Sequence, residues 1–404
     1  MDLELFQKGA SGALVPIVGL TDGRPWEHHA FLPDPLGPVS PDLDGTAYRA
    51  VAEARSSIAA LDATAQRLPN PQLFRDTTLR LEAQSTAALE GTYEPLERVL
   101  SADADEDTTP SIREVLNYLT VAAVAFSTRD DGRRWSVSWL AELQALLLRG
   151  TPGEREHSGE VRPIQVVVGR RPGVPVDALP VKAARYVPPP PGPDLTSRLR
   201  DLLEWMQADH RELIDPVVAA AMGHYLFEAL HPFHDGNGRL GRLLIILHLQ
   251  AQGILTEPTL SVSPWFEARR SDYYDALLAV STDADWSRWI TFFARGIASS
   301  AEGTRARMVA LVDVQRELKE QLRATRSRGD NAQRLIDFAV AQPTFTATQA
   351  ATNLGLTPTG TKKIIDSLVD YGILAPWDQQ VYRRRFHAPR VMQTLLNQSG
   401  TERH

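Results

Sequence analysis

HPFHDGNGRLGR, residues 231–242, is the stretch of sequence that decides the fold of this chain. Residues 215–230 before it carry apolar side chains at helical spacing. Pro232 disfavours the helical conformation in the residue before it, so this first helix is predicted to end there. A second, mostly buried helix is predicted over 239–253, where Gly253 ends it. The quoted stretch therefore joins two apolar helices.

The residue types in this junction suit phosphate chemistry. Gly236-Asn237-Gly238 lies at a helix N-terminus, where outward N–H groups and the helix dipole favour an anion. Arg239 and Arg242 are three residues apart on one helix face, and guanidinium groups suit phosphate oxygens. Asp235 is placed to hold Mg²⁺ against those phosphates, and His231 can take a proton from an attacking hydroxyl.

Each of these features alone is common in proteins that bind nothing. A Gly-Asn-Gly sequence is usually a turn, and a histidine at a helix end is more often a cap or a core residue. Here the features occur together between apolar helices that would bury them, and burying that much polarity without a ligand is costly. The combination therefore favours a binding site.

The segment resembles the signature of the Fic (filamentation induced by cAMP) family, H-x-F-x-D/E-G-N-G-R-x-x-R. The fixed positions are matched by His231, Phe233, Asp235, Gly236, Asn237, Gly238, Arg239 and Arg242. The resemblance implies an enzyme that transfers AMP from ATP to a hydroxyl side chain of a target protein. It also implies the role of each residue. His231 would deprotonate the hydroxyl, Asp235 would bind Mg²⁺, residues 236–239 would hold the α- and β-phosphates, and Arg242 would pair with the γ-phosphate.

A second motif resembles the inhibitory sequence of the same family, S/T-x-x-x-E-G/N. It is Thr86-Ala-Ala-Leu-Glu90-Gly91, at the end of a helix predicted over 77–91 with Gly91 as its cap. The resemblance implies that Glu90 pairs with Arg242 and occupies the γ-phosphate clamp. The chain would then be an N-terminally autoinhibited (class II) member. The alternative for Glu90 is an ordinary surface carboxylate near a helix end.

The segment 159–169, with its run of valines bounded by glycines, predicts a short β-hairpin or flap. It is similar to the family's docking flap, which implies that an extended target segment would bind along Ile164, Gln165, Val166 and Val167. A buried connecting strand is the alternative. The proline run that ends at Pro191 is predicted to be a stiff polyproline II brace.

One position departs from the family pattern. Arg269-Arg270 stands where the family usually has Asn-Arg, which puts the details of nucleotide-base recognition in doubt. Tyr273 or Tyr274 could line an adenine pocket, although aromatics at this spacing are more often core residues.

Composition and charge narrow the classes of protein. The chain has 404 residues, no cysteine and a net charge of −7. Two or three domains, no disulfide and a reducing cytoplasmic location are expected. The start of the chain has no signal-peptide pattern, and the longest apolar stretch, near 243–249, is too short to span a membrane. The negative net charge argues against global affinity for nucleic acid.

The predicted fold is mainly α, a helical core of the Fic type with a short β-hairpin flap and a small C-terminal winged-helix domain. Residues 1–72 form an N-terminal region, extended over 25–43 and helical over 46–68. The predicted catalytic core with its inhibitory helix spans 73–301, followed by a linker helix at 302–330, a winged helix-turn-helix domain at 331–390 and a tail at 391–404.

The C-terminal domain is predicted from three helices, at 332–341, 346–355 and 359–371, and a two-stranded wing at 377–386. This pattern resembles winged helix-turn-helix domains, which mostly bind DNA. In that interpretation the recognition helix presents Thr359, Thr361, Lys362 and Lys363, and the wing arginines 383–385 meet phosphates. A domain that binds protein and keeps only the shape is the alternative.

Three functions therefore stand side by side. The first is a protein adenylyltransferase autoinhibited by Glu90, with ATP as substrate, Mg²⁺ as cofactor and a target protein as partner. The second is the reverse reaction at the same site, in which AMP is removed from a modified target. The third is a DNA-binding regulator whose core senses nucleotide. No membrane partner is expected, and a homodimer is left open because homodimers are common in the family.

Overall fold

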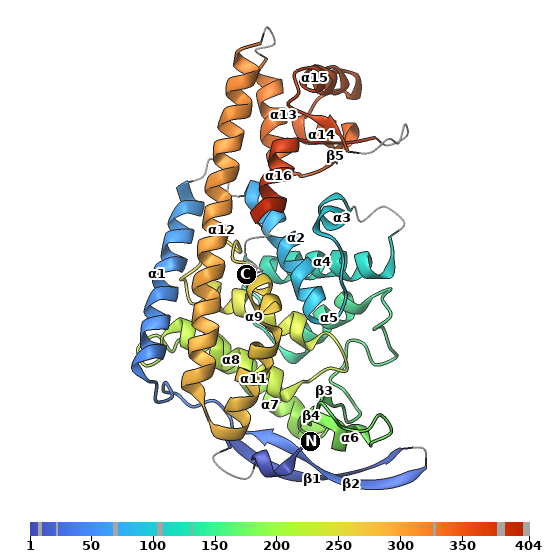
Figure 1. The fold of residues 1–404 in the computed structure, drawn as a ribbon, viewed down its shortest axis with the longest axis vertical. Helices are drawn as coiled ribbons and strands as arrows, with labels where there is room; N and C mark the ends of the chain where they lie inside the picture. Colours follow the sequence, from blue (N-terminus) through green and yellow to red (C-terminus); the bar gives the residue numbers. More distant parts are fainter. Residues whose placement is uncertain are drawn as a thin grey trace. The chain divides into compact units, whose positions relative to one another are not determined.

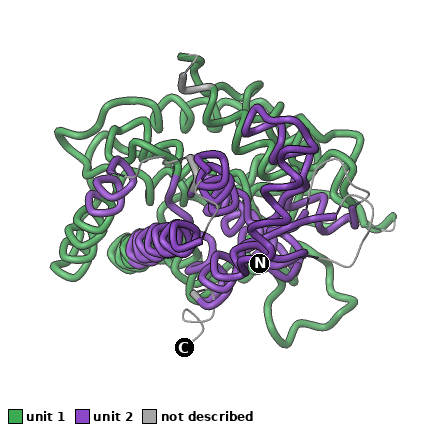
Figure 2. The backbone as a smooth tube through the Cα atoms, turned by 90° about the horizontal axis from the view of Figure 1, so that it is seen from above, with its two compact units in different colours: residues 1–58, 117–258, 269–298 green, residues 59–116, 259–268, 299–404 purple. Residues whose placement is uncertain are grey.

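Two apolar helices, α8 (Pro216–Leu230) and α9 (Asn237–Ala251), pack against each other in the part of the chain that carries residues 231–242 (Figure 1). The computed structural model describes residues 1–6, 10–21, 23–67, 72–102, 108–130, 132–325, 329–377 and 384–398. Two compact units divide the chain. Unit 1 holds residues 1–58, 117–258 and 269–298, and unit 2 holds residues 59–116, 259–268 and 299–404 (Figure 2).

Unit 1 is helical around α8 and α9, with two small sheets. Its remaining elements, in chain order, are η1 (Leu3–Phe6), β1 (Gly12–Thr21), β2 (Arg24–Pro33), part of α1 (Gly45–Arg67), part of α4 (Pro110–Asp130), α5 (Val137–Leu148), β3 (Val168–Arg170), α6 (Pro180–Ala183), β4 (Ala184–Tyr186), α7 (Pro193–Gln207), α11 (Arg270–Asp283) and the first part of α12 (Trp286–Arg323).

Both helices predicted around the junction are confirmed, and α9 begins two residues earlier than expected. The side chain of Asp215 caps α8 by accepting a hydrogen bond from the Val217 N–H at 2.8 Å. Gly241 allows α9 to lie close to α8, because a Cβ there would be 2.9 Å from Phe227 Cδ1. Residues of both helices are almost all buried, so their packing rests on apolar area.

The N-terminal region contains a hairpin that the sequence did not predict. Residues 25–43 were expected to be extended, and β1 and β2 pair antiparallel from Gly12↔Pro33 to Thr21↔Arg24. Gly23 in the turn has φ +75°, which a two-residue hairpin turn requires. The Phe31 N–H at the outer edge of β2 donates to Val187 O at 2.9 Å. The helix predicted over 46–68 is confirmed as α1.

The hairpin predicted within 159–169 is wrong in its bounds. Only β3 is a strand there, and it pairs antiparallel with β4, so Ile164, Gln165, Val166 and Val167 lie outside any strand. Two backbone carbonyls that would pair with another strand in a β-ladder instead accept hydrogen bonds from side chains. Ile164 O accepts from Arg162, and Val166 O accepts from Gln165. In the segment after β4, called the brace below, Pro188 O accepts a hydrogen bond from Gln165 Nε2 at 2.9 Å, and its polyproline II conformation stays a prediction.

Unit 2 contains α2 (Gln72–Leu89), α3 (Leu96–Ser101), α10 (Ser263–Ala268), the second part of α12 and the C-terminal elements. These are α13 (Asp330–Ala341), β5 (Phe345–Thr346), α14 (Ala347–Leu354), α15 (Pro358–Asp370), β6 (Ala375–Pro376), β7 (Arg385–His387) and α16 (Pro389–Gln398). Figure 1 shows α12 as one continuous helix, so the boundary expected between 301 and 302 falls inside it.

The three predicted C-terminal helices are confirmed as α13, α14 and α15. The sheet order is β5-β7-β6, with antiparallel pairs such as Phe345↔Phe386 and Ala375↔His387. Residues 378–383 of the predicted wing, Arg383 among them, lie outside the described residues, as do residues 103–107 and 399–404. The winged-helix interpretation stays a prediction.

Two residues assigned to DNA contacts are buried, which corrects their predicted role. Thr361 is fully buried, and its hydroxyl donates to Thr357 O at 3.1 Å. Arg385 is buried and donates to Ser101 O at 2.9 Å. Helical and strand periodicity turn these side chains inward, while Thr359, Lys362, Lys363 and Arg384 are exposed. Among the helices that the structure describes, none is long and apolar enough to cross a bilayer.

Candidate functional site

His231 ends α8 in an unusual backbone conformation. It is the C-cap residue, with φ 45° and ψ 60° in the left-handed region, and its N–H donates to Phe227 O at 3.0 Å. Non-glycine residues adopt this region only when their surroundings hold them there, and such positions cluster at functional sites. The surrounding structure therefore holds the backbone turn at His231 in the loop between α8 and α9.

Asn237 closes that loop with its side chain. Its Oδ1 accepts from the Phe233 N–H at 2.9 Å, and its Nδ2 donates to Phe233 O at 2.8 Å. Both residues are buried. The amide of Asn237 is thus committed to the loop, so any contribution of this residue to phosphate binding would come from its backbone N–H.

The start of α9 has the features of an anion site. Gly236 is the N-cap residue with φ 84°, and no side chain caps the helix there. The N–H groups of Asn237, Gly238 and Arg239 have no acceptor within the helix, because the first turn of a helix never supplies one. The φ of Gly236 strains any residue with a Cβ, and a Cβ there would also lie 3.0 Å from Leu147 Cδ2, so a larger residue is unfavourable in this turn.

Asp235 lies directly before this helix start. Its Oδ1 accepts from the Gly236 N–H at 2.5 Å and from Arg239 Nη2 at 3.1 Å. The Asp235 side chain is 41% exposed, while that of Arg239 is 3% exposed. A partly exposed carboxylate beside an uncapped helix start fits a Mg²⁺ ion whose other ligands are phosphate oxygens and water. Among the described residues there is no cluster of three or more His, Cys, Asp or Glu side chains that could hold a metal ion.

Three residues that sequence reasoning missed hold this loop in place. Gln144, buried in α5, donates from Nε2 to Asp235 O at 3.1 Å and accepts from the Gly159 N–H at 2.5 Å. Gly153 lies so close to Asp235 that a Cβ would be 2.3 Å from Oδ2. Arg162 donates to His231 O at 2.8 Å. A lone amide in the apolar sequence of α5 was the only local signal.

Arg242 and its neighbour His224 form the buried side of the site. Arg242 is 1% exposed, one turn along α9 from Arg239. Burial, and then the charge of Arg242, lower the pKa of His224 to about 3. His224 therefore stays neutral near pH 7 and adds no positive charge beside the arginine.

Tyr273 is a core residue, which settles one of the alternatives left open by the sequence. It is fully buried, and its hydroxyl lies 2.7 Å from His224 Nε2. The His224 ring stacks on both Tyr273 and Trp289, each with centroids 6.0 Å apart. Tyr274 is half-buried with the Arg270 guanidinium 5.9 Å from its ring centroid. Tyr273 does not line an open pocket for adenine.

Glu90 directly follows the last residue of α2, in unit 2, and it is exposed. The predicted closure of this helix by Gly91 is confirmed. Gly91 has φ 99°, its N–H donates to Ala88 O, and the Thr92 N–H donates to Ala87 O, both at 3.0 Å. These two bonds are the Schellman motif of a helix end. Glu90 and Arg242 belong to different units, and their pairing stays a prediction.

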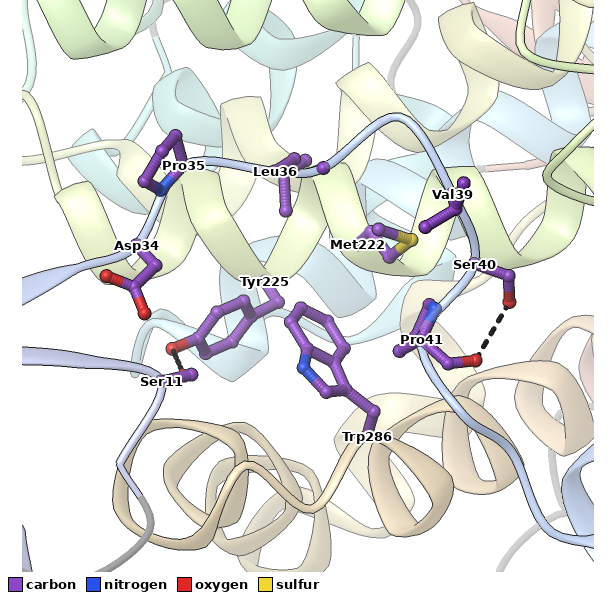
Figure 3. A pocket seen from close by; sticks show the side chains of 11 residues that line it. Ser11, Asp34, Pro35, Leu36, Val39, Ser40, Pro41, Met222, Tyr225 and Trp286 are labelled. Atoms are coloured by element: carbon purple, nitrogen blue, oxygen red, sulfur yellow. Dashed lines mark hydrogen bonds between the residues drawn. The ribbon is translucent and has the colours of Figure 1, made fainter.

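A separate cavity of about 240 Å³ lies in unit 1 beneath the segment 34–41. Figure 3 shows Tyr225 and Trp286 on its wall, with the Tyr225 hydroxyl 3.2 Å from Ser11 Oγ. No residue of 231–242 lines this cavity. It is therefore distinct from the candidate site.

Comparisons with known proteins agree with the site. Residues 48–127 match the family model "Fic/DOC family N-terminal", and residues 134–249 match "Fic/DOC family". The chain is 34% identical over 136 residues to protein adenylyltransferase Fic of Culex quinquefasciatus, covering 34% of this chain and 23% of that protein. It is 36% identical over 109 residues to the protein of that name from Aedes aegypti, covering 27% of this chain and 20% of that protein. The alignments thus span less than a quarter of these relatives.

The crystal structure of a Fic family protein from Desulfovibrio desulfuricans G20 has a similar fold. Its TM-score is 0.53 at 21% sequence identity, and the match covers 87% of this chain and 98% of that one. This similarity identifies the mainly helical fold. The two matched family models make residues 48–127 and 134–249 similar to the Fic/DOC family, and part of this region is distantly similar in sequence to proteins named protein adenylyltransferase Fic.

Proposed function

We propose that this chain is a protein adenylyltransferase, which transfers AMP from ATP to a hydroxyl side chain of a target protein. The observation that carries the proposal is the uncapped start of α9, where Asp235, Arg239 and Arg242 gather directly after His231. A titratable base beside a site built for polyphosphate suits phosphate-centred transfer, which depends mainly on positioning and charge stabilisation. Two distant relatives carry the name of this activity.

In this mechanism His231 accepts the proton of the target hydroxyl as its oxygen attacks the α-phosphorus of ATP. The bond between the α-phosphorus and the bridging oxygen breaks, AMP is joined to the target, and pyrophosphate leaves. The N–H groups of residues 237–239 and the guanidinium groups of Arg239 and Arg242 would stabilise the phosphate charge. Mg²⁺ held by Asp235 would neutralise part of that charge.

Autoinhibition by Glu90 is part of the proposal. Glu90 follows the last residue of α2 at a helix end that two backbone hydrogen bonds define, so the backbone that carries its side chain is fixed. Paired with Arg242, it would remove the guanidinium that the γ-phosphate requires. ATP would then bind in a pose that does not support transfer.

The proposal is tested with α-labelled ATP and Mg²⁺ by following label on protein. Wild type, Glu90→Gly, Glu90→Gln and His231→Asn are compared, since asparagine tolerates the left-handed conformation of position 231. We expect weak self-labelling of wild type, stronger labelling of both Glu90 variants and none of His231→Asn. The control is Glu53→Gln, an exposed carboxylate on α1, which should behave as wild type. Equal labelling of wild type and His231→Asn would sink the proposal.

The same samples distinguish the reverse reaction. Label on a Glu90→Gly sample is isolated, and fresh wild type or fresh Glu90→Gly is added without ATP. Loss of label with wild type alone would assign removal of AMP to this site, with Glu90 taking part.

For residues 330–398 we propose a winged-helix fold, supported by the order of elements α13-β5-α14-α15-β6-β7-α16 and the sheet order β5-β7-β6. Only part of the predicted DNA-binding face is exposed, and Lys362 there lies 3.8 Å from Asp366. A salt titration of duplex DNA binding by the full chain, with Lys362→Glu/Lys363→Glu as the variant, tests that role. Equal binding by both proteins would retire it.

A further inference from the structure

Arg162 is a buried arginine whose partners are all backbone carbonyls. It is 1% exposed and lies just before the segment 164–167. Its Nε donates to His231 O at 2.8 Å, Nη1 to Ile164 O at 3.1 Å and Nη2 to Pro189 O at 2.5 Å. Burial lowers its pKa to about 10, which still leaves it charged near pH 7. A charged group is costly to bury, so its hydrogen bonds must be specific ones.

Two of the hydrogen bonds of Arg162 fix the turn that carries the proposed base. The backbone N–H of Arg162 donates to Pro232 O at 2.9 Å, while Nε donates to His231 O. Consecutive carbonyls are thus bound from one residue. Their directions define the backbone at His231, which is in the left-handed region. A residue in that region needs such support, because the conformation is unfavourable for a side chain with a Cβ.

The other two bonds join this turn to the neighbouring segments. Ile164 O belongs to the segment predicted to dock a target, and Pro189 O belongs to the brace after β4. The brace is itself fixed to α8, because Tyr186 OH donates to Ala229 O at 2.9 Å. The planar guanidinium reaches three carbonyls at once, a geometry that the single ammonium of lysine does not reproduce.

We infer that Arg162 is a positioning residue for His231, which it holds in register with the segment 164–167 without touching the reacting atoms. The inference rests on the proposed function, since it assigns the base to His231. Loss of Arg162 would leave the phosphate groups of ATP bound at the start of α9. It would let the imidazole move relative to the hydroxyl that it deprotonates.

The test uses the full chain in the Glu90→Gly background, with Arg162→Lys and Arg162→Gln. We expect kcat for AMP transfer to fall by about 10²-fold in both, the effect of a displacement near 1 Å. KM for ATP should change less than about threefold, because the lost interaction does not bind ATP. A residue needed only for folding would instead lower the amount of active protein and leave kcat per active site unchanged.

One variant provides a matched control. Arg198→Lys removes a guanidinium that donates to another proline carbonyl, Pro33 O at 2.9 Å, away from the loop. It should retain kcat within about twofold, since Arg198 does not touch the turn at His231. An unchanged kcat in Arg162→Gln, or full activity of Arg162→Lys, would overturn the inference.

A measurement on the wild-type protein decides the point if the variants do not fold. The Arg162 Nε–H should exchange slowly with solvent, and it should stay protected when ATP is added, because the bond to His231 O does not depend on nucleotide. Fast exchange in the free protein would contradict the inference. Failure of Glu90→Gly to transfer AMP would count against the proposed function alone, since this exchange measurement needs no activity.

Discussion

The starts of α9 and α10 are two solutions to one electrostatic problem. Both helices begin in buried surroundings, where the N–H groups of the first turn attract negative charge. At α10, in unit 2, the carboxylate of Glu82 accepts from the Ser263 N–H at 2.9 Å, from Ser261 Oγ at 3.0 Å and from Ser263 Oγ at 2.5 Å. Glu82 is 2% exposed. At α9, in unit 1, no side chain caps the helix.

The difference between the two helix starts distinguishes residues that stabilise the fold from residues proposed to take part in AMP transfer. A protein carboxylate that caps a helix start contributes to the free energy of unfolding, whereas the start of α9, which no side chain caps, is the proposed site of an external anion. Substitutions around α9 should therefore change AMP transfer more than stability, and substitutions around α10 should do the reverse. Four predictions, in order of expected effect, test this separation.

Gly153→Ala should give the largest effect, on activity alone. Its Cβ would lie 2.3 Å from Asp235 Oδ2, so the carboxylate must move. A shift of this kind should lower AMP transfer in the Glu90→Gly background by about 10²-fold. The melting temperature should change little, because Asp235 is at the surface of the site. Gly45→Ala, where an added Cβ meets nothing within 4 Å, is the control. Normal transfer by Gly153→Ala would remove Asp235 from the site.

Glu82→Gln should destabilise unit 2. The neutral amide cannot accept three hydrogen bonds as the carboxylate does, so we expect a loss of about 2–3 kcal/mol in the free energy of unfolding. Urea denaturation measures it. Glu97→Gln, an exposed carboxylate of α3, should stay within about 0.5 kcal/mol of wild type. A urea midpoint of Glu82→Gln equal to that of wild type would mean that the carboxylate at this buried helix start contributes no more to the free energy of unfolding than a surface residue does.

Acid should destabilise the α8–α9 pair through its buried histidines. Burial is the first cause that lowers the pKa of His224 to about 3 and of His248 to about 4. In the unfolded chain both histidines would titrate near pH 6.5. Between pH 6.5 and 4 the unfolded state therefore binds more protons than the folded state, and the free energy of unfolding decreases as the pH decreases. Each group contributes at most about 1.4 kcal/mol per pH unit.

Urea midpoints at pH 7, 6 and 5 measure this dependence. His248→Gln should reduce the slope, and His157→Gln, an exposed histidine, should not. A flat profile in wild type would show that the two imidazoles are not neutral in the folded protein.

Thr346→Ala should give the smallest effect. Thr346 and Gln349 form a capping box at the start of α14, a neutral counterpart of the carboxylate at α10. Its loss should cost about 1 kcal/mol of unfolding free energy and leave AMP transfer unchanged. Thr352→Ala, at an exposed position within α14, is the matched control. A loss as large as that of Glu82→Gln would erase the distinction between neutral and charged caps.

Features encoded by neighbouring residues could be predicted from the sequence. The helices α8 and α9, the closure of α2 by Gly91 and the three C-terminal helices follow from apolar periodicity and local capping residues. The candidate site residues 231–242 are contiguous, so one stretch of sequence identified them together. The hairpin β1–β2 was missed although Asp22-Gly23 is a common hairpin turn, because its strands alternate only weakly between apolar and polar residues.

Contacts between distant residues could not be predicted. Arg162 lies in a segment that reads as a strand, and its role depends on carbonyls 69 and 27 residues away. Gly153 is important only because Asp235 packs against it. From the sequence, the Asn237 side chain could be assigned to a ligand, but in the structure it accepts a hydrogen bond from the Phe233 N–H. The burial of Thr361 and Arg385 likewise depends on which helix face and which strand edge pack inward.

The prolines of the β1–β2 hairpin bear on the solubility of the protein. The Phe31 N–H points away from β1, since it donates to Val187 O. The N–H groups along each strand point alternately toward and away from the partner strand. By this alternation, an N–H would also point away from the partner strand at Pro16, which is paired with His29, and at Pro25 and Pro33 on β2. A two-stranded ribbon has two open edges that invite pairing with another chain, and proline removes a donor from them. Pro16→Val would restore one donor beside the exposed Val18, and aggregation on concentration should increase.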